Sequence, residues 1–187
     1  DVTVIGTVKR RQALTRRGAR PGDDLYVSGT IGAAAAGLQM LKSTTTESTE
    51  DNEDHGPIEL PRPPSSSVSS VVEHCVQRYL RPEPRIRLGL MLARNRAATA
   101  CIDLSDGLTD GVHQIATASG VGAIIDAEAL PIDPAAREWF EARGLDPVAE
   151  SLGAGDDYEL LFAVKPSAGR RLASANRQIA DDLIAQG

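Results

Sequence analysis

The chain has 187 residues, of which 41% are hydrophobic and 25% charged, and this length suits a domain with a core of its own. Its formal charge of −6 and its 3% of aromatic residues exclude a nucleic-acid partner held by a basic surface or by base stacking. No apolar run reaches the roughly 18 residues of a membrane span, and no stretch reads as a signal peptide. The two cysteines form no disulfide framework, so we expect a cytoplasmic protein.

The first forty residues predict two strands and a helix. The β-branched run at 2–8 is typical of a strand, and the turn residues at 21–24 precede a short strand at 25–28. The glycine-containing segment 29–32 then opens an alanine-rich helix that ends near Leu41. This opening could cradle a phosphate, but it matches neither of the standard phosphate-binding motifs. A structural turn is the alternative interpretation.

The composition changes between residues 43 and 67. This segment combines acidic residues, Ser, Thr and Pro, and it has almost no apolar side chains. Such a segment cannot bury enough apolar surface to offset the entropy of ordering it. We therefore expect a flexible, exposed insertion, with an acidic metal-binding loop as the alternative.

Helical order resumes after this insertion. Apolar residues recur at helical spacing over 68–80, and Cys75 lies on that stripe, where a buried thiol of the core is expected. Pro82 and Pro84 end the helix, and a second helix is expected at 86–96.

The last part of the chain alternates strands and helices. We expect strands at 98–103, 122–126 and 158–164, and helices at 105–119, at 133–144 and from Pro166 onward. Gly120 ends the first of these helices, and Asp133 followed by Pro134 has the pattern of an N-cap. This alternation predicts an α/β or α+β layered domain with βαβ units.

Two carboxylates, Asp103 and Asp106, straddle the end of a strand and the first turn of a helix. The free N–H groups and partial positive charge of such a turn suit a phosphate, and carboxylates there can hold Mg²⁺ that bridges to it. In the alternative interpretation, Ser105 or Asp106 only caps the helix.

A second acidic group follows a glycine-rich turn at 153–155. Asp156, Asp157 and Glu159 lie close together at the start of a strand, and adjacent carboxylates repel unless a cation or hydrogen-bond donors are present. This pattern indicates either a binding site or a solvated turn. We expect Asp156 to converge with the first acidic pair at one edge of the sheet, at strand ends.

A third candidate is the basic stretch around Arg16, because arginine binds phosphates in a bidentate manner. On its own this signal is weak. The histidines, His55, His74 and His113, show no pattern of nucleophilic catalysis, and His74 suggests only helix packing.

Taken in order, these pieces resemble the C-terminal half of the thiamine-monophosphate kinase family, in the superfamily of aminoimidazole ribonucleotide synthetase and selenophosphate synthetase. The resemblance rests on the segments 13–19, 21–23, 26–30, 35–38, 81–85, 101–108 and 155–160. Its most specific part is Asp-Leu-Ser-Asp-Gly-Leu followed about fifty residues later by Gly-Asp-Asp-Tyr-Glu-Leu.

The resemblance implies an activity and a set of residues. The family transfers the γ-phosphate of ATP to thiamine monophosphate by direct in-line, Mg²⁺-assisted transfer, so no residue is expected to act as a catalytic nucleophile. By resemblance, Asp103 and Asp106 would bind the metal, and Ser105 and Arg16 the nucleotide. Asp156 would bind the substrate.

The resemblance also implies an architecture. The fold would be a mixed sheet with flanking helices, and residues 1–187 would form one C-terminal domain of a larger enzyme that lacks its N-terminal domain here. Such a fragment would be inactive alone, and its parent would be a homodimer through the missing domain, with no membrane or nucleic-acid partner. Ala33 stands where the family has an acidic residue, and this departure puts a ligand role there in doubt.

Two rival functions remain open. The first is another ATP-using enzyme of the same superfamily, with an amidine or selenophosphate product. The second is a non-catalytic remnant that binds a nucleotide or a metal. The run at 156–160 favours the thiamine branch.

Overall fold

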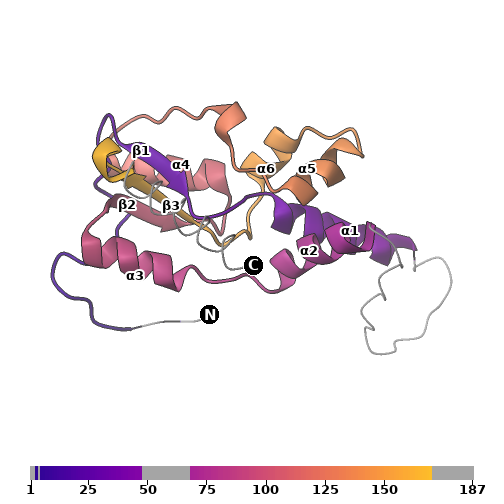
Figure 1. Ribbon diagram of the computed structural model, residues 1–187, viewed down its shortest axis with the longest axis horizontal. Helices are drawn as coiled ribbons and strands as arrows, with labels where there is room; N and C mark the ends of the chain where they lie inside the picture. The colour runs from indigo at the N-terminus through magenta and orange to yellow at the C-terminus, as the bar shows by residue number, and fades with distance from the viewer. Residues whose placement is uncertain (1–2, 4, 48–67, 170–187) are drawn as a thin grey trace, which may run out of the picture.

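The computed structural model describes residues 3, 5–47 and 68–169. Groups of helices separate the three strands along these residues (Figure 1). In chain order they are β1 (Asp24–Val27), α1 (Ala33–Glu47), α2 (Val68–Leu80), α3 (Ile86–Asn95), β2 (Ala98–Asp103), α4 (Leu108–Ser119), the 3₁₀ turn η1 (Ala127–Ala129), α5 (Pro134–Glu141), α6 (Pro147–Gly153) and β3 (Leu160–Val164).

The three strands form one sheet in the order β1-β3-β2. β3 is antiparallel to both neighbours, with Asp24 opposite Val164 and Asp103 opposite Leu160. β1 and β2 therefore run in the same direction with β3 between them, and one parallel bridge joins Ile31 to Ile132. The α/β layered class with flanking helices is confirmed. Neighbouring strands of the described sheet pair only antiparallel, so the mixed sheet that the resemblance implied and the expected βαβ units are not found in it.

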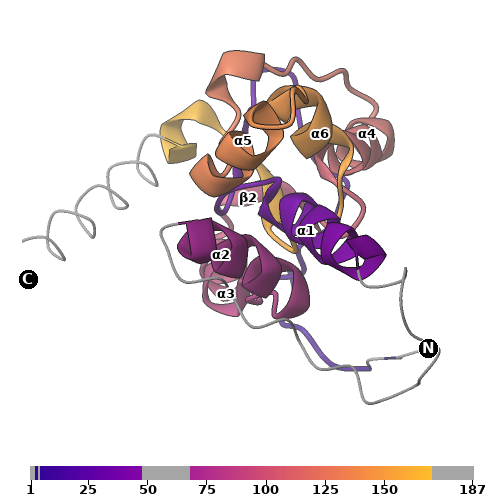
Figure 2. The ribbon, with the colours of Figure 1, turned by 90° about the vertical axis from the view of Figure 1, so that its right-hand side faces the viewer.

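The sheet lies between two helical layers (Figure 2). Successive side chains of a strand point to opposite faces, so Leu161 and Ala163 face one layer while Phe162 faces the other. The first layer is α4, whose inward stripe consists of Leu108, Val112 and Ile115. The second layer is α3, where Leu92 is fully buried against Phe162.

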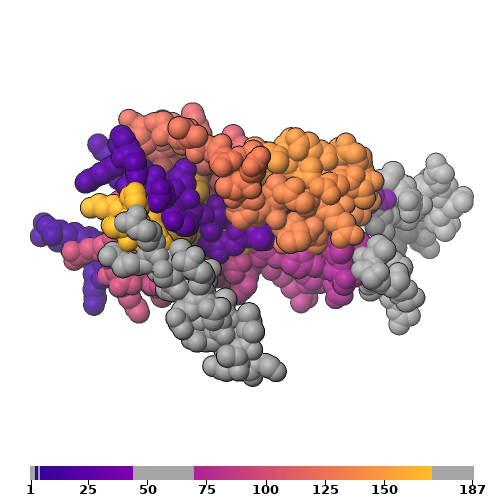
Figure 3. Space-filling model, turned by 45° about the horizontal axis from the view of Figure 1, so that its top comes forward, coloured from indigo at the N-terminus to yellow at the C-terminus, as the bar shows by residue number. Residues whose placement is uncertain are grey.

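A second core lies where α1, α2 and α5 pack together at the end of the sheet. It is centred on Met40, Cys75 and Phe140, and Cys75 is fully buried, as predicted. A Cβ at Gly37 would lie 2.2 Å from the Cys75 carbonyl oxygen, so only glycine allows α1 and α2 to approach this closely. The orange surface of α5 and α6 continues directly into the magenta surface of α2 (Figure 3).

The predicted cap of the helix at 133–144 is confirmed. The Asp133 side chain accepts hydrogen bonds from the first turn of α5, and Pro134 occupies the first helical position. The helix is shorter than expected and ends at Glu141. The chain then turns at Gly144, which has a φ of 68°. α6 follows, with Asp146 as its N-cap. This helix is not predicted from the sequence.

Two predicted strands are wrong. Residues 3 and 5–8 form no strand, and 122–126 is extended without ladder partners. Composition favours a strand in both places, but a strand also needs a partner, and Ile124 is 98% exposed. The expected strand at 158–164 starts later, at Leu160.

The limits of the expected insertion also differ. α1 continues to Glu47, so the segment expected to be irregular from residue 43 begins as a helix. Its remainder, 48–67, lies outside the described residues, as does most of the helix expected from Pro166, of which 166–169 are helical. Within the described ranges, no helix is long and apolar enough to cross a membrane.

Candidate active site

Three carboxylates lie at the end of the sheet where β1 and β2 finish and β3 begins. Asp103 is the last residue of β2, and Asp106 follows three residues later. The Asp156 N–H donates to the Ser105 carbonyl oxygen at 2.8 Å, which joins the loop before β3 to the loop after β2. We call Asp103, Asp106 and Asp156 the acidic edge. The structure thus brings them and Ser105 together, as expected.

Neither Ser105 nor Asp106 caps α4. The helix begins at Leu108, and its N-cap is Gly107, with no side chain accepting from the first turn. Ser105 Oγ instead donates to Asp106 Oδ2 at 3.3 Å. The helix-capping interpretation is therefore wrong. Gly107 has a φ of 95°, and a Cβ there would lie 2.5 Å from the Ala154 carbonyl oxygen, so glycine is needed where the two loops meet.

The acidic edge carries negative charge that no neighbouring base neutralises. Within the described residues, no Lys, Arg or His nitrogen lies within 4.0 Å of its carboxylates. This negative charge also acts on Tyr158. The charge of Asp156 raises the pKa of Tyr158 most, and burial and the charges of Asp103 and Asp106 raise it further. Such oxygen donors suit Mg²⁺.

The acidic edge is not a complete metal cage. Among the described residues, no group of three or more His, Cys, Asp or Glu side chains is assembled to hold a metal ion. Asp103 and Asp106 are exposed and Asp156 is half-buried. These residues fit a Mg²⁺ ion that takes its other ligands from water and from a substrate phosphate, which is the usual way in which Mg²⁺ is bound.

Asp157, the neighbour of Asp156, points the opposite way. It is 4% exposed, and its carboxylate accepts from the N–H of Gly32 at 2.8 Å and of Ala34 at 3.2 Å. These N–H groups lie at the start of α1, where the helix itself provides no acceptor for them. The phosphate-cradle interpretation of 29–32 is therefore wrong, because an internal carboxylate occupies that position, and the structural-turn interpretation is confirmed. Burial raises the pKa of Asp157.

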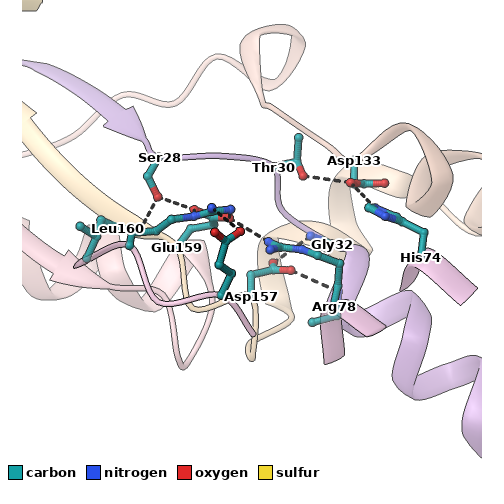
Figure 4. Close-up of polar contacts among 12 residues, drawn as sticks. Ser28, Thr30, Gly32, His74, Arg78, Asp133, Asp157, Glu159 and Leu160 are labelled. Carbon is teal, nitrogen blue, oxygen red and sulfur yellow. Dashed lines mark hydrogen bonds and ion pairs between the residues drawn. The ribbon is translucent and has the colours of Figure 1, made fainter. Parts of the chain in front are cut away.

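Glu159 is also buried, with no exposed surface. Arg78 lies 2.8 Å and Arg85 2.5 Å from its Oε1, and Ser28 Oγ donates to Oε2 (Figure 4). Burial alone would raise its pKa, but hydrogen bonds from Arg85, Ser28 and Arg78 outweigh burial and hold the pKa below its usual value. A Cβ at Gly29 would lie 2.6 Å from this carboxylate, so the glycine makes room for it.

A third buried carboxylate, Asp133, joins three elements. Besides capping α5, it accepts from Thr30 Oγ1 at 2.9 Å and lies 3.0 Å from His74 Nε2 (Figure 4). Burial opposes its ionisation, but His74 and Thr30 lower its pKa overall. His74 thus binds a buried carboxylate, which corrects the expectation of packing alone.

Arg16 lies beside α4 rather than at its start. Its guanidinium donates to Gln114, which in turn donates to Asp110. Gln114 is six residues beyond Leu108, about 9 Å along the helix axis. The structure therefore does not bring Arg16 into direct contact with the acidic edge.

An apolar groove of about 680 Å³ lies elsewhere on the domain. It runs between β1, the inner face of α4 and the segment 121–131, which includes η1, and its walls include Leu25, Val112 and Ile124. None of the three carboxylates of the acidic edge lines it.

The inward anchors were not predicted from the sequence. A partial signal was present, because residues 156–159 precede a strand and alternate positions of a strand face opposite sides, although Asp156 and Tyr158 themselves adopt a positive φ. Asp156 and Tyr158 then share the outer side, and Asp157 and Glu159 share the inner side. The partners Arg78 and Arg85 carried no such signal, since nothing local places them against Glu159.

The chain is similar to known proteins. Residues 20–183 match the family model of the AIR synthase related protein, C-terminal domain. The thiamine-monophosphate kinase of Salmonella typhimurium is 39% identical over 162 residues, which cover 86% of this chain and 42% of that protein. The chain thus spans less than half the length of such curated relatives.

Solved structures agree with this result. A crystal structure of the thiamine-monophosphate kinase from Stenotrophomonas maltophilia superposes with a TM-score of 0.73 at 35% identity, covering 92% of this chain and 49% of the other. A structure of AaThiL complexed with AMPPCP and TMP gives a TM-score of 0.65 at 32% identity, over 83% of this chain and 43% of the other. The chain belongs to the family of AIR synthase related protein C-terminal domains.

Proposed function

We propose that this chain is the C-terminal part of a thiamine-monophosphate kinase, which transfers the γ-phosphate of ATP to thiamine monophosphate and forms thiamine diphosphate. The observation that carries the proposal is the acidic edge, where three carboxylates from the end of β2 and the two adjoining loops converge. In the part of the chain that the structure describes, none of them has a basic partner. Support also comes from the relatives named for this activity and from a relative complexed with AMPPCP and TMP.

In this proposal the acidic edge binds cation and substrate. Asp103 and Asp106 hold Mg²⁺ through their carboxylate oxygens, and Ser105 contacts the nucleotide. When bound, the metal neutralises charge on the transferring phosphoryl group. Asp156 binds thiamine monophosphate, whose positively charged ring system suits a carboxylate.

No protein nucleophile is needed. Phosphoryl transfer depends mainly on positioning and on neutralisation of charge. Arg16 would face the nucleotide phosphates from its place beside α4, about two turns from the acidic edge. A triphosphate is long enough for different phosphates to meet Arg16 and the acidic edge.

The remaining parts of the proposal concern the whole enzyme. The described residues supply two metal ligands and one substrate contact, so further ligands would come from an N-terminal domain. We accordingly expect residues 1–187 alone to make no thiamine diphosphate. We also expect the complete kinase to be a cytoplasmic homodimer.

The metal site can be tested on this chain with Mn²⁺, which takes the same ligands as Mg²⁺ and broadens nearby NMR signals. Titrating ¹⁵N-labelled protein should first broaden the amide signals of 103–107 and 155–158. Asp106→Asn should weaken this broadening at least about 10-fold, whereas Asp146→Asn, an exposed cap of α6, should not. Broadening spread evenly over all exposed acids would contradict the site.

A further inference from the structure

The backbone just before β3 is held in an unusual conformation. Asp156 and Tyr158 have φ values of 67° and 51°, which lie in the left-handed region that non-glycine residues rarely adopt. Such conformations persist only when the surroundings impose them. Contacts on two sides of the segment impose this conformation.

Two backbone hydrogen bonds fix the strained residues from one side. The Asp156 N–H donates to the Ser105 carbonyl at 2.8 Å, and the Tyr158 N–H donates to the Leu104 carbonyl at 3.1 Å. These bonds tie the segment to the loop that carries Asp106. They do not determine which side chains point outward.

Two buried carboxylates fix the segment from the other side. Asp157 binds the N–H groups of Gly32 and Ala34 at the start of α1. Glu159 binds Arg78 of α2 and Arg85, the residue before α3. The start of α1, α2 and the residue before α3 thus hold residues 157 and 159 inward, and the residues on either side of Asp157 point outward.

We propose that Asp157 and Glu159 are positioning residues that lock the 156–159 backbone, so that Asp156 and Tyr158 are held at the acidic edge. This inference deepens the proposed function and rests on it in one respect, the contact of Asp156 with the substrate. The placement of Tyr158, which is 41% exposed, can be tested without measuring enzyme activity.

The test uses ¹⁹F NMR of the chain labelled with 3-fluorotyrosine. The chain has three tyrosines, namely Tyr26, Tyr79 and Tyr158, and Tyr158→Phe assigns the third signal. Asp157→Asn keeps one acceptor oxygen and loses the other, so one amide of α1 is released. We expect the Tyr158 signal to move, or its linewidth to increase at least about 2-fold, while the signals of Tyr26 and Tyr79 keep their positions.

Asp133→Asn is the matched control. Asp133 is 5% exposed, accepts from two amides at a helix start, and also contacts the 28–32 loop through Thr30. Among the residues that the structure describes, Asp133 forms no hydrogen bond or ion pair with residues 156–159. Asp133→Asn should lower stability but leave the Tyr158 signal unchanged.

Either of two results would overturn the proposal. One is an unchanged Tyr158 signal in folded Asp157→Asn, which would make Asp157 a helix cap only. The other is an equal change in both variants, which would indicate general loosening. If Asp157→Asn does not fold, hydrogen exchange of the unsubstituted chain decides. The Gly32 amide, which donates to the Asp157 carboxylate, should exchange at least about 100-fold more slowly than an unprotected amide, and unprotected exchange overturns the lock.

The complete kinase offers a second readout. Asp157→Asn should raise the KM for thiamine monophosphate about 10-fold while kcat changes less, because a displaced Asp156 weakens binding of the substrate. A purely structural role would lower the amount of active enzyme and leave KM unchanged. A shifted Tyr158 signal without any change in KM would retain the lock and refute the substrate contact of Asp156.

Discussion

The carboxylate of Asp157 binds the backbone N–H of Gly32, which lies 125 positions earlier in the chain. This bond places the acidic loop before β3 directly on the start of α1. It also satisfies amides at the helix start that would otherwise lack a partner. The same short segment therefore carries an outward carboxylate, Asp156, and the inward carboxylate that fixes it.

Glu159 should contribute strongly to stability. Glu159→Ala leaves Arg78 and Arg85 without their shared partner, and breaking a buried ion pair costs about 3–5 kcal/mol. We expect a loss near the lower end, because the side chains of Arg78 and Arg85 keep 15% and 25% of their surface exposed. Urea denaturation measures the loss. Glu141→Ala, which breaks an exposed pair with Arg137, should change stability by less than about 1 kcal/mol.

Acid should destabilise the protein partly through Glu159. Its folded-state pKa lies below the ordinary value of 4.5, so its contribution is present above pH 4.5 and is lost as the pH falls through the folded-state pKa. Glu159→Gln should therefore flatten the acid dependence of the free energy of unfolding. Asp157 has a raised pKa, so Asp157→Asn should steepen the dependence. Identical slopes in all three proteins would contradict these shifts.

Gly32 should not tolerate a side chain. Its φ is 91°, and a Cβ there would lie 2.3 Å from Ser151 Oγ, which is fully buried. Gly32→Ala should lower the free energy of unfolding by about 2 kcal/mol or more, through backbone strain and the close contact. Gly122→Ala is the control, because nothing lies within 4 Å of its Cβ position, and it should leave the melting temperature unchanged.

Local signals predicted the elements that local chemistry determines. Apolar spacing placed α2 and α4, and the Asp133-Pro134 pair placed the start of α5, because these features depend on near neighbours in the chain. The strand expected at 122–126 was wrong because strand formation depends on a distant partner. The extent of α1 beyond residue 43 was missed because polar residues can continue a helix that is already packed.

The candidate site was predicted only on its outer side. Asp103 and Asp106 lie at and just after the end of β2, and Asp156 lies just before β3. Because β2 and β3 are antiparallel, the end of one and the start of the other meet at the same edge of the sheet. The inner side depends on Arg78, Arg85 and the amides of α1, whose approach to residues 157 and 159 is a tertiary event. For this reason the sequence indicated a cluster of five acids but not that two of them, Asp157 and Glu159, serve as internal anchors.

The central claim is that the acidic edge supports phosphoryl transfer, and thiamine diphosphate formation by the complete kinase tests it most directly. Asp106 caps no helix, so Asp106→Asn should keep the melting temperature of the unsubstituted enzyme. It should lower turnover by about 100-fold or more, which is the scale of losing one contact that stabilises transition-state charge. Asp146→Asn should retain normal turnover. Near-normal turnover of Asp106→Asn at limiting Mg²⁺ would contradict the account.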